Sequence, residues 1–179
     1  MRFLDIEIPG AWVIEADPHR DERGSFFRLW CSDEFAQKGI GFAPVQGNMG
    51  FSHERGTIRG LHYQVAPAQE AKLVRCTRGA MYDVVVDLRP DSPTYCRWVG
   101  IELNGNDHRT LFVPEGCAHG YQTLENATGM FYLTSAAYAP AAVRGARFDD
   151  PAFGISWPLP VSRISDQDRE WQAFQREEE

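Results

Sequence analysis

Two histidines, a lysine and an arginine stand in two short polar segments of the chain. Arg59 lies three residues before His62, Gln64 follows two residues after it, and Lys72 begins the next apolar run. The segment at 114–119 ends in His119. Transition-metal sites need three or four N, S or O ligands, and this set offers two imidazoles beside a cation. It suits proton transfer next to an anion better than metal chemistry.

The two segments resemble the two halves of a cupin metal site. The first half of that motif reads G-x5-H-x-H-x3-4-E-x6-G. His62 stands at the first ligand position, Gln64 at the second, and Lys72 at the position of the carboxylate ligand. A cation cannot ligate a cation, so we expect the site to hold no metal.

Length, composition and charge narrow the possible classes of protein. A chain of 179 residues with 43% hydrophobic residues can build one sizeable core, which predicts a single domain over residues 1–179. The net charge of −7 argues against binding to nucleic acid or to a membrane surface. No apolar run is long enough to span a membrane, and no signal peptide is visible. Four cysteines without CxxC spacing indicate reduced thiols in a cytoplasmic protein.

The hydrophobic pattern is mostly that of β-strands. Short apolar or alternating runs recur about every ten residues, which is typical of a sandwich or barrel. They lie at 11–15, 72–77, 81–88, 95–103, 110–113, 120–124 and 129–135. Helices are predicted at 32–39, with Ser32 as N-cap, and at 165–175, with Ser165 as N-cap; residues 176–179 should be a solvated end. We therefore expect an all-β, cupin-like jelly roll with a few short helices.

A series of motifs from residue 5 to about residue 170 resembles the dTDP-4-dehydrorhamnose 3,5-epimerase family. Each motif is weak alone, but the whole set occurs in the expected order. The motifs are DERG at 21–24, Q-x-N at 46–48, IRGLHYQ at 58–64, KLV at 72–74, GAMYDVVVDLR at 79–89, SPT at 92–94, PEGCAHG at 114–120, FYLT at 131–134, YAP at 138–140, DDPAFGI-x-WP at 149–158 and SDQD at 165–168.

The resemblance implies a homodimeric jelly roll that needs no cofactor. It would invert C3, C5 or both of a nucleoside-diphosphate 4-keto-6-deoxyhexose, most simply dTDP-4-dehydro-6-deoxyglucose to dTDP-4-dehydrorhamnose. The ketone at C4 acidifies the hydrogens on both neighbouring carbons. By motif position, His62 would be the base and Asp168 the carboxylate that orients it. Tyr132 would be the acid on the opposite face, and Lys72 would stabilise the enolate oxygen.

The same motif positions imply a set of substrate-binding residues. The diphosphate and nucleoside end would be held by polar side chains, among which arginine suits phosphate because its guanidinium binds in a bidentate manner. An aromatic ring would stack on the base. The polar residues are Arg23, Gln46, Asn48, Arg59 and His119, and the ring is that of Tyr138.

Several of these assignments have simpler alternatives. Tyr132 lies in an apolar strand and could be a core residue, and Arg23 could pair with Asp21 or Glu22. Asp166 competes with Asp168 for the role of the carboxylate. A second group of carboxylates is expected to make structural hydrogen bonds or to cap turns, namely Asp83, Asp87, Asp149 and Asp150.

The chain also departs from the family pattern at the substrate end. Arg28 stands where the family has Glu, Gln167 replaces the usual Lys, and the stretch between Asn48 and Arg59 is one residue longer. The nucleotide (dTDP, CDP, GDP or UDP), the sugar and the number of centres inverted therefore stay open. Two other classes also stay open, a sugar-nucleotide-binding protein without turnover and a metal-using cupin oxygenase or isomerase.

Overall fold

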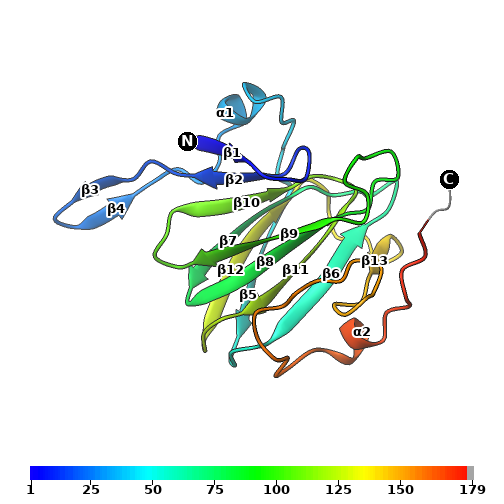
Figure 1. Cartoon of the computed structure of the whole chain (residues 1–179). Coiled ribbons are helices and arrows are strands. Elements are labelled where there is room, and N and C mark those ends of the chain that lie inside the picture. Colours follow the sequence, from blue (N-terminus) through cyan, green and yellow to red (C-terminus); the bar gives the residue numbers. More distant parts are fainter. Residues whose placement is uncertain (177–179) are drawn as a thin grey trace.

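The computed structural model describes residues 1–176, and two antiparallel sheets packed face to face dominate them (Figure 1). Residues 177–179 of the expected solvated tail lie outside the described residues. One sheet has six strands, in the order β1 (Arg2–Asp5), β2 (Trp12–Glu15), β10 (Arg109–Val113), β7 (Lys72–Arg78), β12 (Thr128–Thr134) and β5 (Gln46–Ser52). The other has five, in the order β13 (Val143–Gly145), β6 (Ile58–Gln64), β11 (Cys117–Thr123), β8 (Ala80–Asp87) and β9 (Trp98–Asn104). The predicted all-β jelly roll is confirmed.

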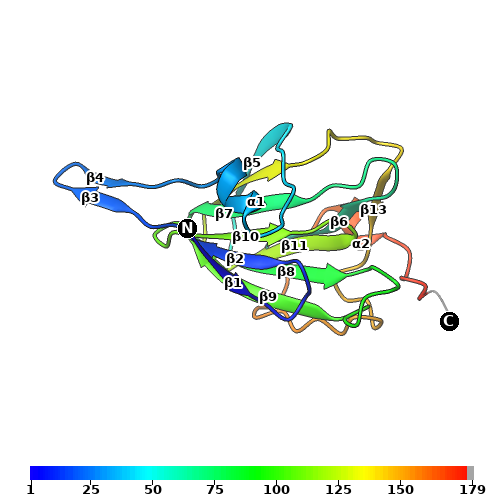
Figure 2. The same cartoon turned by 90° about the horizontal axis from the view of Figure 1, so that it is seen from above.

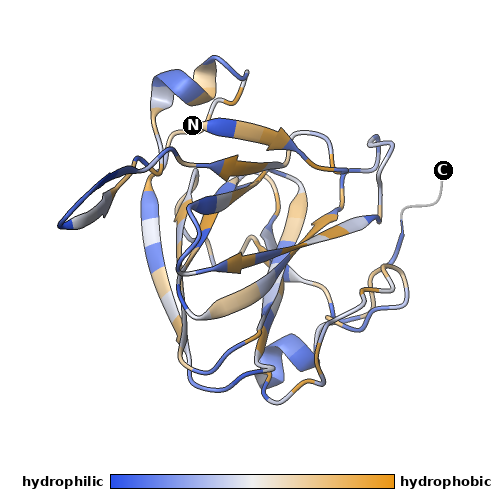
Figure 3. Ribbon diagram, turned by 60° about the vertical axis from the view of Figure 1, so that its left-hand side comes forward, coloured by the Kyte–Doolittle hydropathy of each residue, from blue (hydrophilic) through white to orange (hydrophobic). Residues whose placement is uncertain are grey.

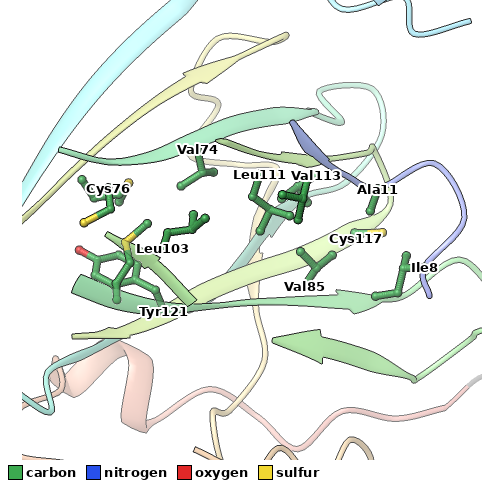
Figure 4. Packing of buried hydrophobic residues seen from close by; sticks show 13 residues of the cluster. Ile8, Ala11, Val74, Cys76, Val85, Leu103, Leu111, Val113, Cys117 and Tyr121 are labelled. Atoms are coloured by element: carbon green, nitrogen blue, oxygen red, sulfur yellow. The ribbon is translucent and has the colours of Figure 1, made fainter. Parts of the chain in front are cut away.

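Side chains from the facing sides of the two sheets form the central core. Because side chains alternate between the faces of a strand, Val74 of β7 and Val85 of β8 point inward and meet in one cluster with Leu111 and Tyr121. Figure 4 shows this cluster between the layers, and Figure 2 shows the layers from above. The core therefore fixes how far apart the two sheets lie.

The outward faces of both sheets are covered as well. On the five-stranded sheet, Val84 and Val86 pack in a second cluster with Phe153 and with partly buried rings from the segment that follows β13. On the six-stranded sheet, Leu73 packs with Phe35 of α1 (Ser32–Ala36) in a third cluster. This double coverage explains why most of β8 and all of β11 are buried rather than alternating with exposed residues.

A hairpin formed by β3 (His19–Asp21) and β4 (Gly24–Phe26) projects away from the sandwich (Figure 1). Its residues are exposed and it is largely hydrophilic, in contrast to the apolar strands of the interior (Figure 3). At its base the Phe27 ring packs against the guanidinium of Arg75, 4.7 Å from the ring centroid, and against His108. The hairpin is thus anchored at one end only.

Both helices and the start of β9 differ from the sequence expectation. Cys31, not Ser32, is the N-cap of α1, and no side chain caps this helix. Ser165 does cap α2 (Asp166–Arg169), but the helix ends there, well before residue 175. Beyond it, the Phe174 ring lies 5.0 Å from that of Phe153, so side-chain packing replaces helix extension. Strand β9 begins at Trp98, because residues 92–97 form turns. No helix within residues 1–176 is long and apolar enough to cross a membrane.

Candidate active site

A pocket of about 760 Å³ lies between the two sheets and is closed on one side by residues 163–168. Its walls include β5, β7 and β12 from the six-stranded sheet and β6 and β11 from the five-stranded sheet. Nine of the ten predicted site residues line it, namely Gln46, Asn48, Arg59, His62, Lys72, His119, Tyr132, Tyr138 and Asp168. Seven of them lie on strands of the two sheets, Tyr138 lies in the loop after β12 and Asp168 lies on α2, so distant segments of the sequence meet in this pocket.

His62 and Asp168 form a hydrogen-bonded pair at the pocket wall. His62 Nε2 lies 2.5 Å from Asp168 Oδ1, and the carboxylate is almost fully buried whereas the imidazole is 41% exposed. Burial raises the pKa of Asp168, but hydrogen bonds from His62, the Gly60 backbone N–H and Ser165 outweigh this and leave the pKa below its usual value. An ionised Asp168 fixes Nε2 as the protonated nitrogen, so Nδ1 is the one that can accept a proton.

The backbone at Gly60 brings Asp168 to this position. Gly60 has φ +119° and its N–H donates to Asp168 Oδ2 at 3.2 Å. A Cβ there would lie 2.6 Å from the Cα of Gly120 on β11. Only glycine allows both this φ and this close approach. The register of the β6–β11 ladder shifts at the same place, next to the cross-strand pair of His62 and His119.

Lys72 is buried in the pocket wall on β7. Its Nζ lies 3.1 Å from Glu70 Oε1 and donates to the His62 carbonyl at 3.1 Å. Burial lowers the pKa of Lys72 below that of a free lysine, while the charges of Glu70 and Asp83 oppose the shift. The ammonium group therefore lies directly beside the backbone of the proposed base.

Tyr132 lies on β12 in the sheet opposite His62. Burial raises the pKa of its phenol, and the negative charge of Glu70 adds to the effect, so the group keeps its proton at neutral pH. Tyr132 is paired across strands with Asn48 of β5, whose side-chain NH₂ is buried and has no partner among the described residues. The pocket thus carries a proton acceptor on one sheet and a proton donor on the other.

His119 and Arg59 form a second polar group. His119 Nε2 lies 2.5 Å from Asp83 Oδ1, and both side chains are buried. The guanidinium of Arg59 donates to Ser52 Oγ and to the Phe51 carbonyl. Its described hydrogen bonds go to neutral oxygens, so its positive charge is available to an anion in the pocket.

The mouth of the pocket is formed by residues 46–48 and the loop after β12. The Gln46 side chain accepts a hydrogen bond from the Tyr138 N–H and donates one to Asn48. The Tyr138 ring is exposed, since 63% of the residue is accessible. This ring is therefore free to stack on a planar group at the entrance.

Arg23 is the one predicted site residue that the pocket of its own chain does not contain. It lies at the exposed turn between β3 and β4, and its guanidinium pairs with the carboxylate of Asp21. The simpler alternative of a pair with Asp21 is confirmed, and the substrate contact expected of Arg23 stays a prediction. The hairpin carries Arg23 away from the sandwich (Figure 1).

Comparison with known proteins identifies the family. The family model described as dTDP-4-dehydrorhamnose 3,5-epimerase matches residues 5–176. The chain belongs to this family. A dTDP-4-dehydrorhamnose 3,5-epimerase of Sinorhizobium fredii is 42% identical over 92% of this chain and 84% of its own. A crystal structure of the Bacillus anthracis dTDP-4-dehydrorhamnose 3,5-epimerase with TDP and pyrophosphate bound is 36% identical, with a TM-score of 0.93 over 97% of this chain and 99% of that chain.

Relatives with a narrower stereochemical outcome are also similar. A dTDP-4-dehydrorhamnose 3-epimerase of Streptomyces niveus is 37% identical over 95% of this chain and 82% of its own. As a member of the dTDP-4-dehydrorhamnose 3,5-epimerase family, the chain is an isomerase of the epimerase class. The chain is thus similar both to a 3-epimerase and to 3,5-epimerases.

Sequence reasoning missed one residue of this epimerase site, Glu70, and did not foresee the hydrogen-bond partners of two others, Gln64 and Asp83. Glu70 lines the pocket beside Lys72, and its spacing of two residues in extended chain could have indicated a shared face. In the sequence, Gln64 stands at the position of a cupin metal ligand. In the structure, its side-chain amide forms hydrogen bonds with the backbone, donating to the Ala137 carbonyl and accepting from the Ala139 N–H. Asp83 does make the structural hydrogen bond expected of it, and the partner is His119 within the site.

Proposed function

We propose that this epimerase inverts C3, C5 or both of dTDP-4-dehydro-6-deoxyglucose; inversion at both carbons forms dTDP-4-dehydrorhamnose. The observation that carries the proposal is that His62 of β6, paired with Asp168 of α2, faces the same pocket as Tyr132 on the opposite sheet. Such a pair can remove a proton from one face of a sugar while a phenol returns a proton to the opposite face.

The reaction would proceed through an enolate. Nδ1 of neutral His62 takes the proton from the carbon beside the C4 ketone, and the bonding electrons move onto the ketone oxygen. Asp168 stabilises the imidazolium that forms, and the Lys72 ammonium stabilises the oxyanion. Tyr132 then gives its proton to the same carbon from the other side, and solvent restores both groups. The carbon thereby changes configuration with no net change in redox state.

The rest of the pocket would hold the nucleotide. Arg59 supplies donors for the diphosphate, since it has no carboxylate among its described hydrogen-bond partners, and His119 would line the same end of the substrate. Gln46 and Asn48 offer amide groups near the entrance, where Tyr138 would stack on the base. A pocket of about 760 Å³ is of the size that small-molecule sites usually have.

We also propose that the enzyme works as a homodimer in the cytoplasm. The hairpin exposes Phe26 (77% accessible), and the edge strand β5 exposes Met49 (73%), so both carry apolar surface that a second copy could cover. Docking of the hairpin on a partner chain would be the way for Arg23 to approach a substrate. Four free cysteines fit a reducing compartment. Light scattering of wild type and Phe26→Asp tests the dimer, and an unchanged mass would refute the role of the hairpin.

The test of the proposed function is hydrogen exchange on the sugar. The protein is incubated in D₂O with dTDP-4-dehydro-6-deoxyglucose, and deuterium entry at C3 and C5 is followed by NMR together with the change in configuration. Parallel samples carry CDP, GDP and UDP sugars. If deuterium enters none of the four nucleotide sugars, the protein binds sugar nucleotides without turnover. If deuterium enters at one carbon only, the enzyme is a mono-epimerase.

A further inference from the structure

Glu70 is a buried carboxylate in the pocket wall to which the proposed mechanism gives no role. It lies in the loop between β6 and β7, two residues before Lys72, and its side chain is 12% exposed. One carboxylate oxygen, Oε1, lies 3.1 Å from Lys72 Nζ. The other, Oε2, accepts a hydrogen bond from Gln64 Nε2 at 3.3 Å. Both oxygens are therefore held, and the carboxylate faces the one ammonium group of the site.

Gln64 fixes this carboxylate to the rest of the pocket. The same amide nitrogen also lies 2.9 Å from the Ala68 carbonyl and 3.2 Å from the Ala137 carbonyl, so its two hydrogens are shared among three acceptors. The amide oxygen accepts from the Ala139 N–H at 2.7 Å. Glu70 is thus tied to the loop that carries Tyr138 as well as to its own loop. A carboxylate anchored in this way presents its charge at a fixed place.

We propose that Glu70 is a positioning residue that keeps Lys72 charged and aimed at the ketone oxygen. The inference rests on the enolate-stabilising role proposed for Lys72. Lys72 Nζ has two described partners, the Glu70 carboxylate and the His62 carbonyl. A buried ammonium with only a carbonyl for support would be costly to keep charged. Glu70 supplies the opposite charge that burial makes necessary.

Other titratable groups face Lys72 from the neighbouring strands, and none of them can replace Glu70. Asp83 on β8 also favours the charged lysine, but its carboxylate is held by His119 on β11. His62 on β6 presents its carbonyl to the lysine and its ring to Asp168. Tyr132 on β12 is neutral with its pKa raised, chiefly by burial and then by Glu70. Loss of Glu70 would lower the pKa of both proton-bearing groups, Lys72 and Tyr132.

The charge on Lys72 determines the direction in which the pH dependence of the rate should change. Lys72 must be protonated to stabilise an oxyanion, so activity falls as the pH rises through its pKa. Burial already lowers that pKa, and removal of the Glu70 charge would lower it further. An opposite charge within about 4–6 Å typically shifts a pKa by about 1–3 units. Glu70→Gln should therefore move the alkaline limb of the rate profile downward by about 1–3 pH units.

The chain offers an unusually clear way to read the lysine directly, because Lys38 and Lys72 are its only two lysines. Lysine labelled with ¹³C and ¹⁵N gives two sets of side-chain signals, and Lys38→Arg assigns them. The pKa of Lys72 is then measured by NMR titration without substrate in wild type, Glu70→Gln and Glu70→Asp. The surface variant Glu15→Gln, which loses an ion pair with Arg2, is the matched control.

The proposal expects three results together. The Lys72 titration moves down in Glu70→Gln, the alkaline limb of kcat/KM moves down with it, and Glu70→Asp restores most of both. Glu15→Gln should leave both at the wild-type values. An unmoved Lys72 titration would overturn the proposal, and so would a loss of rate in Glu70→Gln that is equal at all pH values, since that marks a purely structural role. If the lysine titration moves and the rate limb does not, the enolate role of Lys72 itself is wrong, and the role of Glu70 falls with it.

Discussion

The Asp168 carboxylate should accelerate the reaction only through His62. Asp168→Asn removes the charge beside the imidazole and keeps a side chain of the same shape. The asparagine oxygen can still accept the hydrogen bond from the Gly60 N–H, which Asp168 Oδ2 now accepts at 3.2 Å, but its NH₂ would then face His62 Nε2. The substitution therefore keeps the packing of residues 163–168 and tests the charge together with the tautomer of the imidazole. The loss worked from the charge alone is the minimum expected.

The size of the effect can be worked from the geometry. Two unit charges about 4 Å apart interact by roughly 4 kcal/mol at an effective dielectric constant of about 20. The His62 side chain is 41% exposed, so water screens part of this attraction. About half, or roughly 2 kcal/mol, corresponds to about a 30-fold loss of rate when the imidazolium forms without Asp168. Loss of the base itself in His62→Ala should cost about 10²–10⁴-fold.

The assay is a double-mutant cycle with deuterium exchange as the readout. Rates of exchange beside the ketone are measured by NMR for wild type, the two single variants and the double variant. Asp166→Asn serves as the matched control, because Asp166 is an exposed carboxylate in the first turn of the same helix. Thermal unfolding of each variant checks that the fold is retained. Asp166→Asn should exchange at the wild-type rate.

The cycle has a clear refuting outcome. If Asp168 acts through His62, its replacement in the His62→Ala background should change the rate by less than about twofold. Additive losses would mean that Asp168 contacts the substrate or shapes the pocket independently. A His62→Ala variant that keeps more than a tenth of the wild-type rate would remove His62 from the role of base.

Three further predictions concern the acid, the absence of a metal and the stability of the fold. Tyr132→Phe should reduce inversion far more than deuterium exchange in one NMR time course, because His62 can still return a proton to the face it came from; equal losses would refute the two-face assignment. Activity should survive EDTA, and elemental analysis should find less than one metal ion per chain, because Gln64 and Lys72 occupy two cupin ligand positions; loss on stripping with recovery on metal return would contradict this. Burial raises the pKa of Asp87, but its hydrogen bonds prevail and lower the pKa from 3.8 to about 2. The ionised carboxylate should therefore contribute roughly 2 kcal/mol to the free energy of unfolding above about pH 4, and this contribution should disappear as the pH falls toward 2. Urea unfolding of Asp87→Asn should lack this pH dependence.

The fold class and most of the pocket could be predicted because their signals are local. Short apolar runs at regular spacing indicated the sandwich. His62, Tyr132 and Asp168 stood in ordered motifs, and the structure brings them to one pocket. Strand β5 was not predicted as a strand, since its sequence combines two glycines with polar residues, and its apolar residues Met49 and Phe51 are exposed rather than in the core. Its pairing with β12, which no local pattern reveals, makes it a strand.

The remaining differences arise from contacts between distant segments. The second helix was expected to reach residue 175, but the Phe174 N–H bonds to the Asp150 carboxylate and the ring packs on Phe153. Arg23 lies in a motif that resembles the family, but no local sequence pattern predicts the direction in which its hairpin projects from the two sheets. Glu70 belongs to no motif quoted from the sequence, and its role depends on the three-dimensional position of Gln64 and Lys72.

The core between the sheets sets the distance between the proposed base, His62, and the proposed acid, Tyr132. His62 and Tyr132 stand on different sheets, and core side chains between those sheets, Cys76, Met81 and Leu103 among them, keep the sheets apart. These three side chains are not among the residues that line the pocket. A change of volume at these positions would move the donor relative to the acceptor without altering any residue of the pocket wall. Packing between the sheets would thus be a second route, besides the pocket residues themselves, by which the stereochemical outcome of such an enzyme changes.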